Sequence, residues 1–218
     1  MKIFDIHTTI AILHEEYLGW RTPAVTIIAE CGRSPYKVLV ACIISLRTKD
    51  EVTALAAARL FARAATPGEM LSLATDEIAQ LIYPAGFYHT KAAQILEISR
   101  QLVAEHDSCV PDEINDLLQF KGVGRKTANL VVTLGFNKPG ICVDTHVHRI
   151  CNRWGYVATK TADETERVLR DILPAEYWIE INDLLVAFGQ NHCHPVSPRC
   201  SSCRLNERCP RMGVRSFR

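Results

Sequence analysis

The sequence predicts an all-α protein, and three observations support that fold class. Apolar residues recur at spacings of three and four along most of the chain, as in Leu96, Ile98, Leu102 and Val103. The alternation typical of strands is nearly absent, and the apolar triplet at residues 141–143 is too short to support a sheet. With 48% hydrophobic residues in 218, the chain has material for one large or two modest cores, so disorder is excluded.

Helix start signals recur along the chain and predict about ten short helices. Each signal combines an N-capping side chain with a first-turn proline, a capping-box glutamate, or both. The predicted starts are Ser34 with Pro35, Thr66 with Pro67 and Glu69, Pro111 with Asp112, and Thr161 with Glu164. The connections are short and carry glycine or proline, as at residues 83–87 and 137–140, and no repeat or low-complexity segment is found.

The formal net charge of +1 conceals a strong asymmetry along the chain. Residues 119–160 carry a net charge of +6 and residues 190–218 a net charge of +5, which leaves −10 for the remainder. Two basic segments on an acidic body indicate a surface for a polyanion, although charge runs are often only solvated faces. Charge alone does not decide between a nucleic-acid surface and a solvated face.

Nothing in the sequence predicts a membrane span or an export signal. The longest strongly apolar run, residues 38–46, is far shorter than the roughly 20 residues that cross a bilayer. Residues 1–17 mix acidic and apolar side chains, unlike a signal peptide, so we expect a cytosolic protein. Reducing thiol buffers there argue against disulfides. Five scattered cysteines are expected to be small buried hydrophobes: Cys31, Cys42, Cys109, Cys142 and Cys151.

The other four cysteines lie within seventeen residues, as Cys193-x6-Cys200-x2-Cys203-x5-Cys209. Four thiolates in one short loop can enclose a tetrahedral zinc ion or a cubane iron–sulfur cluster. Zinc sites usually come as two short pairs, whereas here one pair is flanked by two single cysteines, which favours iron–sulfur over zinc. Either group would cross-link the tail, whose weak apolar periodicity predicts that it has no core of its own.

A glycine hairpin spans residues 120–129, with the sequence FKGVGRKTAN. Gly122 and Gly124 stand between helical stretches at residues 114–119 and 127–136, and leave backbone N–H groups accessible to a phosphate at a helix N-terminus. A P-loop would need glycine where Arg125 stands, and a dinucleotide fingerprint would need a third glycine where Thr127 stands. The alternative is a simple helix-turn-helix in which glycine only forms the turn.

Lys126 follows this hairpin in the first helical turn, next to Arg125. The helix dipole and the neighbouring cation both oppose protonation, which suits an amine that forms a Schiff base. An ordinary solvated or phosphate-pairing lysine is the alternative. Asp144 precedes a helical run to Trp154 and is expected to cap it. The same carboxylate could support positive charge on a sugar ring or assist proton transfer at the lysine.

Together, the glycine hairpin with Lys126, the VDTH segment at residues 143–146 and the four-cysteine terminus resemble the endonuclease III family of DNA glycosylases and abasic-site lyases. The resemblance extends over nearly the whole chain and includes SLRTKD at residues 45–50. It implies a two-lobed helix-hairpin-helix fold. A six-helix lobe would span residues 28–138, and residues 1–27 and 139–218 would form a lobe holding a [4Fe-4S] cluster in the loop 193–209.

The resemblance also implies excision of oxidised pyrimidines from duplex DNA and nicking of the abasic site by β-elimination. Lys126 would attack the sugar and Asp144 would support it, the two facing each other across a cleft between the lobes. The four cysteines of the tail, Cys193, Cys200, Cys203 and Cys209, would ligate the cluster. The expected DNA contacts are Lys121, Gly122, Val123, Gly124, Arg125, Arg47, Phe87 and Arg199. The expected partner is duplex DNA with damaged bases or abasic sites, bound by a cytoplasmic, nucleoid-associated monomer.

Three positions qualify the resemblance. Lys121 stands where the family commonly has proline, and Arg47 where many relatives have a glutamine that fills the gap left by the everted base. Phe87 matches a position that inserts an apolar wedge between bases, but a buried aromatic is an equally good interpretation. Related mismatch glycosylases lack the lysine and only remove the base, so Lys126 favours the lyase. A non-enzymatic DNA-binding module would leave Lys126 and Asp144 without a purpose.

Overall fold

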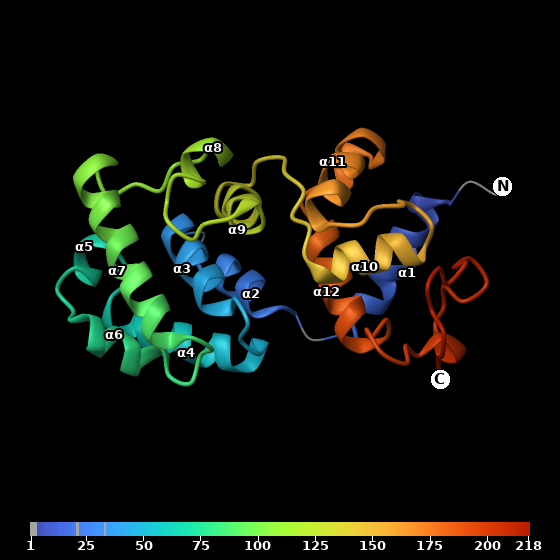
Figure 1. Ribbon diagram of the computed structural model, residues 1–218, viewed down its shortest axis with the longest axis horizontal. Coiled ribbons are helices and arrows are strands. Elements are labelled where there is room, and N and C mark those ends of the chain that lie inside the picture. Colours follow the sequence, from blue (N-terminus) through green and yellow to red (C-terminus); the bar gives the residue numbers. More distant parts are fainter. Residues whose placement is uncertain (1–3, 21, 33) are drawn as a thin grey trace. The chain divides into compact units, whose positions relative to one another are not determined.

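The computed structural model is entirely helical in the part of the chain that it describes, residues 4–20, 22–32 and 34–218 (Figure 1). It confirms the predicted fold class, since the apolar triplet at residues 141–143 forms no strand. The chain divides into two compact units. We call Ala24–Gly140 the central unit and Met1–Pro23 with Ile141–Arg218 the terminal unit. None of the helices within the described ranges is long and apolar enough to cross a membrane.

The central unit is built around helix α3, Pro35–Ser45. Ser34 caps its N-terminus by accepting a hydrogen bond from the backbone N–H of Lys37, and Pro35 occupies the first turn, as predicted. Residues 38–44 are at most 1% exposed, so the helix is buried on all its faces. It packs against α2, α4, α7 and α9. The bounds of the other helices are α2 Ala24–Glu30, α4 Asp50–Arg63, α5 Pro67–Met70, α6 Thr75–Ile82, α7 Tyr88–Glu105, α8 Ile114–Leu117 and α9 Arg125–Leu130.

Two predictions for this unit were wrong in detail. No helix begins at Pro111, since α8 starts three residues after that proline, and the carboxylate of Asp112 pairs with Lys138 at 2.8 Å. The helix after the glycine hairpin starts at Arg125 and becomes a π-helical segment at Val131–Gly135. The hydroxyl of Thr133 donates to the carbonyl of Asn129 at 2.8 Å, a bond of the kind that perturbs a regular helix.

The apolar pattern that predicted a helix here is only partly buried in α7. Ile95, Ile98 and Leu102 are at most 1% exposed, whereas Val103 is 40% exposed. The spacing of three and four along the buried residues is helical, and Val103 lies outside the buried stripe. That stripe begins at Lys91, a charged residue that is only 5% exposed.

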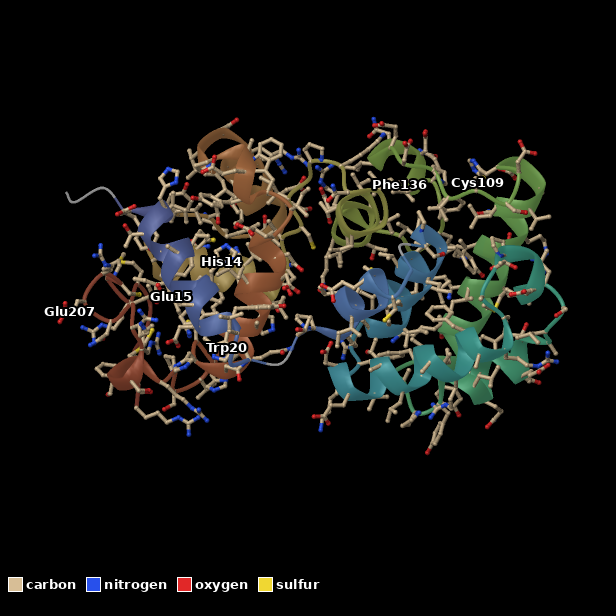
Figure 2. The ribbon with its side chains drawn as sticks, turned by 180° about the vertical axis from the view of Figure 1, so that it is seen from behind. His14, Glu15, Trp20, Cys109, Phe136 and Glu207 are labelled. Carbon is tan, nitrogen blue, oxygen red and sulfur yellow. The ribbon has the colours of Figure 1, made fainter. Side chains whose placement is uncertain are left out.

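The terminal unit joins the two ends of the described chain. Figure 1 shows α1, Ile6–Tyr17, beside α10, Thr145–Arg153, and α12, Ile181–Asn191, with α11, Ala162–Ile172, packed on α10. Trp20, labelled in Figure 2, stacks on Phe188 with ring centroids 5.8 Å apart. Glu15, also labelled there, pairs with Arg204 of the tail at 2.8 Å. These contacts fasten α1 to both the core and the cysteine-bearing tail.

The cysteine prediction was partly wrong. Cys42, Cys142 and Cys151 are buried as expected, but Cys31 and Cys109 are exposed. Cys31 follows the end of α2 and Cys109 follows the turn after α7, so neither lies on a helix face that packs against a core. In a connecting segment, apolar neighbours in sequence do not ensure burial.

Candidate nucleic-acid site

The glycine hairpin connects α8 to α9 through a tight turn at residues 118–124. Gly122 adopts a φ of 81°, in the left-handed region that favours glycine. Val123 is 6% exposed and anchors the turn, and its backbone N–H donates to the carbonyl of Phe120 at 3.0 Å. The side-chain amide of Gln94 on α7 donates to the carbonyl of Lys121 at 3.1 Å. Gly124 and Arg125 are exposed, so the end of the turn faces solvent.

Replacing Gly122 with alanine should destabilise the fold by about 1–2 kcal/mol, because an L-residue is disfavoured at this φ. The added Cβ would also lie 2.6 Å from the amide nitrogen of Gln94 and displace that side chain from the turn. We expect denaturant unfolding to show this loss and DNA affinity to fall with it. Gly124→Ala is the matched control, because its Cβ meets nothing within 4 Å. Equal losses of stability in both variants would contradict the argument.

Lys126 is the second residue of α9 and is half-buried. Helix α9 packs against α3, and the charge of Lys126 acts on the thiol of Cys42 in α3. Burial raises the pKa of Cys42 to about 12, and Lys126 opposes that shift. The thiol therefore stays protonated at neutral pH. The predicted nucleophile is thus held at the junction of the hairpin and the core of the central unit.

Asp144 lies in the terminal unit and caps α10, as predicted. Its Oδ1 accepts hydrogen bonds from the backbone N–H groups of His146, at 2.8 Å, and Val147, at 3.0 Å. The side chain is 9% exposed, and its charge also acts on the guanidinium of Arg149. A carboxylate held by two backbone donors has a fixed orientation.

Arg47 and Phe87, predicted separately as DNA contacts, contact each other within the central unit. The guanidinium carbon of Arg47 lies 5.3 Å from the centroid of the Phe87 ring, within the range of a cation–π interaction. Phe87 is 63% exposed, which excludes the buried-aromatic interpretation. Both residues have left-handed backbones, with φ of 54° and 59°. We call Arg47 and Phe87 the wedge pair.

Sequence reasoning missed the residues behind the wedge pair. Lys91, Thr48 and Gly86 hold the two loops through contacts between segments about forty residues apart. The one available signal was Lys91, a charged residue at the start of the apolar stripe of α7. A buried lysine needs polar partners, but the sequence alone does not identify them.

The four cysteines of the tail line one cavity with about 30 Å³ of free space. Burial raises the pKa of Cys203 to about 11, and the neighbouring thiol groups of Cys193, Cys200 and Cys209 contribute to this shift. Thiols this close repel one another as thiolates, and a bound cation or iron–sulfur cluster would neutralise that repulsion. The donor set therefore fits a metal group with four thiolate ligands.

Two arginines of α10 support the cysteine cavity, and no motif in the sequence pointed to either of them. Nη1 of Arg153 donates to Sγ of Cys193 at 3.2 Å, and Nη2 of Arg149 donates to the carbonyl of the same cysteine at 2.8 Å. Arg199, a predicted DNA contact, is exposed, and its backbone N–H donates to the carbonyl of His192 at 3.0 Å. The positive charge of Arg149 and Arg153 would stabilise thiolates in the cavity.

Comparison with known proteins gives a consistent result. Residues 40–175 match the model of the HhH-GPD superfamily of base excision DNA repair proteins. The chain is 45% identical over 175 residues to endonuclease III of Thermotoga maritima, covering 80% of this chain and 82% of that relative. It superposes on a non-covalent endonuclease III–DNA complex with a TM-score of 0.83 and 31% identity, covering 94% of this chain and 93% of the other. A trapped covalent endonuclease III–DNA intermediate gives a TM-score of 0.76 at 34% identity, covering 81% and 83%.

Proposed function

The chain belongs to the endonuclease III family, within the HhH-GPD superfamily of base excision DNA repair proteins, and we propose that it excises oxidised pyrimidines from duplex DNA. It is a DNA glycosylase with abasic-site lyase activity. The observation that carries the proposal is a half-buried lysine, Lys126, in the first turn after a glycine hairpin. One of the matched structures is a covalent endonuclease III–DNA intermediate, which is the kind of species that a nucleophilic lysine would form.

In this proposal the damaged nucleotide is everted from the duplex before the chemistry begins. Eversion costs a few kcal/mol and costs least where base pairing is already impaired, which favours damaged bases. The wedge pair would fill the gap left in the stack, since Phe87 supplies an exposed apolar ring and Arg47 supplies hydrogen-bond donors. The turn from Lys121 to Arg125 would hold a phosphate through backbone N–H groups and side-chain charge.

Lys126 would then attack the sugar carbon that bears the base. The base leaves with the electron pair of the glycosidic bond and takes up a proton, while the attacking amine loses one. The C1′–O4′ bond then opens, with its electron pair and a proton going to the sugar oxygen, and the lysine remains attached to C1′ as a Schiff base. Loss of the 3′ phosphate by β-elimination breaks the strand. Asp144 would support positive charge on the same sugar and accept a proton from the amine. The capping bonds at Oδ1 keep this carboxylate oriented during both roles.

Four thiolates, from Cys193, Cys200, Cys203 and Cys209, would hold a [4Fe-4S] cluster in the terminal unit. When bound, the cluster cross-links the tail, in which only Pro198 and Leu205 are buried among residues 193–218, all of which the structure describes. Arg199 would then meet the DNA backbone from an ordered loop. We propose that the enzyme works as a monomer in the cytoplasm, on nucleoid DNA, and sedimentation at a mass above 24.4 kDa would contradict the monomer.

The direct test of the function is a panel of duplexes that carry oxidised pyrimidines, oxidised purines, mismatches or no lesion. Base release and strand nicking are scored separately on each duplex. We expect both products from oxidised pyrimidines, and nicking alone from a duplex that already contains an abasic site. Base release without nicking would exclude the lyase. Turnover confined to mismatches would exclude the proposed substrate class.

Asp144→Asn should lower base release by about a hundredfold, because it removes the charge that supports the sugar cation. Asparagine retains an oxygen that accepts from the N–H groups of His146 and Val147, so the free energy of unfolding should change little. Single-turnover excision and denaturant unfolding measure the two effects. Asp144→Ala is the paired variant, and loss of the cap should cost it about 1 kcal/mol of stability. An Asp144→Asn enzyme with full activity would remove this carboxylate from the mechanism.

A further inference from the structure

One buried side chain, Lys91, ties together the two loops that carry the wedge pair. Its ammonium group donates to the carbonyl of Ile44 at 2.7 Å and to the carbonyl of Leu46 at 2.5 Å, at the end of α3. It also donates to the hydroxyl of Thr48 at 2.9 Å. The residue between the last two acceptors is Arg47. The ammonium group therefore holds the backbone on both sides of the arginine.

The three acceptors match the three N–H donors of a protonated lysine. Lys91 is 5% exposed, and burial lowers its pKa to about 8. The amine is still largely protonated at neutral pH, so all three donors are present. Burying an ammonium group is costly unless every donor is satisfied, and here the acceptors satisfy them. Few other side chains could donate to all three acceptors, which lie at the end of α3 and in the segment that follows it.

The loop that carries Phe87 is attached to the same cluster. The backbone N–H of Gly86 donates to the hydroxyl of Thr48 at 3.0 Å. A Cβ on Gly86 would lie 2.5 Å from the carbonyl oxygen of Arg47, so the two backbones touch. This close approach requires glycine at position 86. Arg47 and Phe87 are consequently neighbours through their backbones as well as through their side chains.

Helix α7 also sets where the wedge pair lies relative to the glycine hairpin. Gln94 follows Lys91 by three residues, which places the two side chains on one face of the helix. Gln94 donates to the carbonyl of Lys121 in the hairpin, while Lys91 donates to the Arg47 loop. A single rigid helix therefore contacts both predicted DNA-binding loops of the central unit.

We propose that Lys91 is a positioning residue, which fixes the wedge pair as one rigid element at a set offset from the glycine hairpin. This inference rests on the proposed function, since it assumes that Arg47 and Phe87 enter the duplex. Loops ordered in advance lose less conformational entropy when they insert between bases. Lys91 itself is buried and would not contact the DNA. Its effect should appear in eversion of the nucleotide and not in the chemistry that follows.

The test replaces Lys91 with methionine, which fills similar space without donors. Eversion is followed by the fluorescence of 2-aminopurine placed beside the lesion, and nicking is measured on a single strand with a preformed abasic site. We expect the eversion equilibrium to fall by about tenfold or more, since three bonds to a charged group are lost. Nicking of the single strand should be unchanged, because a strand without a complement has no gap to fill.

Two further variants keep the test decisive. Ser99→Ala removes a buried hydroxyl from the same helix, where it bonds to the hydroxyl of Tyr36 at 2.6 Å, and should lower stability without changing eversion. Gly86→Ala should push the Arg47 carbonyl away and impair eversion even if Lys91→Met folds poorly. If Lys91→Met loses duplex and single-strand activity alike, as a destabilised protein would, the positioning role is refuted.

The wedge-pair variants separate failure of this inference from failure of the proposed function. If Arg47→Ala and Phe87→Ala impair eversion but Lys91→Met and Gly86→Ala do not, the positioning role of Lys91 is refuted and the wedge assignment stands. If Arg47→Ala and Phe87→Ala leave eversion unchanged, the wedge assignment fails and the positioning role fails with it. Impaired eversion in all four variants, with single-strand nicking retained, supports the inference.

Discussion

Replacing Lys126 with alanine is expected to lower the rates of base release and strand nicking by about a thousandfold or more, because no other group would supply the nucleophile. Borohydride reduction of the wild-type enzyme on abasic DNA should trap a covalent adduct, since it reduces the Schiff base to a stable amine. The alanine variant should give no adduct. Gel electrophoresis of protein and DNA after reduction measures the trapped fraction.

Arg125→Ala is a suitable control for the Lys126 experiment. Arg125 is the preceding residue and is exposed, so its loss removes the same charge from the same turn without removing the proposed nucleophile. DNA affinity should weaken in both variants, while trapping should fail only in Lys126→Ala. An adduct of undiminished yield in Lys126→Ala would show that another amine carries the chemistry.

Replacing Cys203 with alanine is expected to remove the yellow-brown colour and the acid-labile sulfide that we predict for the purified protein. In small domains with a structural zinc site, metal binding contributes on the order of 10 kcal/mol to folding. The tail here has little core of its own, so we expect it to lose order without its metal group. Its arginines should then become accessible to trypsin. Iron and sulfide analysis, visible absorption and limited proteolysis measure these effects.

Cys151→Ala is the matched control for the cluster experiment. Cys151 is 1% exposed in the core of the terminal unit and does not line the cysteine cavity, so its loss should reduce stability and leave the colour unchanged. Colourless wild-type protein that contains one zinc ion per chain would overturn the iron–sulfur assignment. Full iron content in Cys203→Ala would remove that cysteine from the ligand set.

The sequence predicts best where the interaction is local. The cap at Asp144, the N-cap at Ser34 and the capping box at Thr66 all span three residues or fewer, and the structure confirms them. The helix start predicted at Pro111 is wrong, since α8 begins at Ile114, and the carboxylates of Asp112 and Glu113 instead pair with Lys138. Local helix propensity does not include tertiary contacts, so it does not fix the exact residue at which a helix begins.

The candidate site shows the same division. The glycine hairpin and the four-cysteine motif each lie within a short stretch of sequence, so residue spacing alone indicates what each could bind. The contact between Arg47 and Phe87 joins residues forty positions apart, and Lys91, one helical turn after Phe87, reaches back across the same interval to the Arg47 loop. Their association follows from how α3 and α7 pack, which residue patterns do not specify.

The order in which the chain leaves the ribosome matters for the terminal unit. The central unit is one uninterrupted stretch, so all of its partners emerge together. Helix α1 is made before the central unit, yet the helices that share its apolar core, α10 and α12, emerge only after the whole central unit has been translated. The apolar face of α1 can therefore be buried by these helices only after that interval.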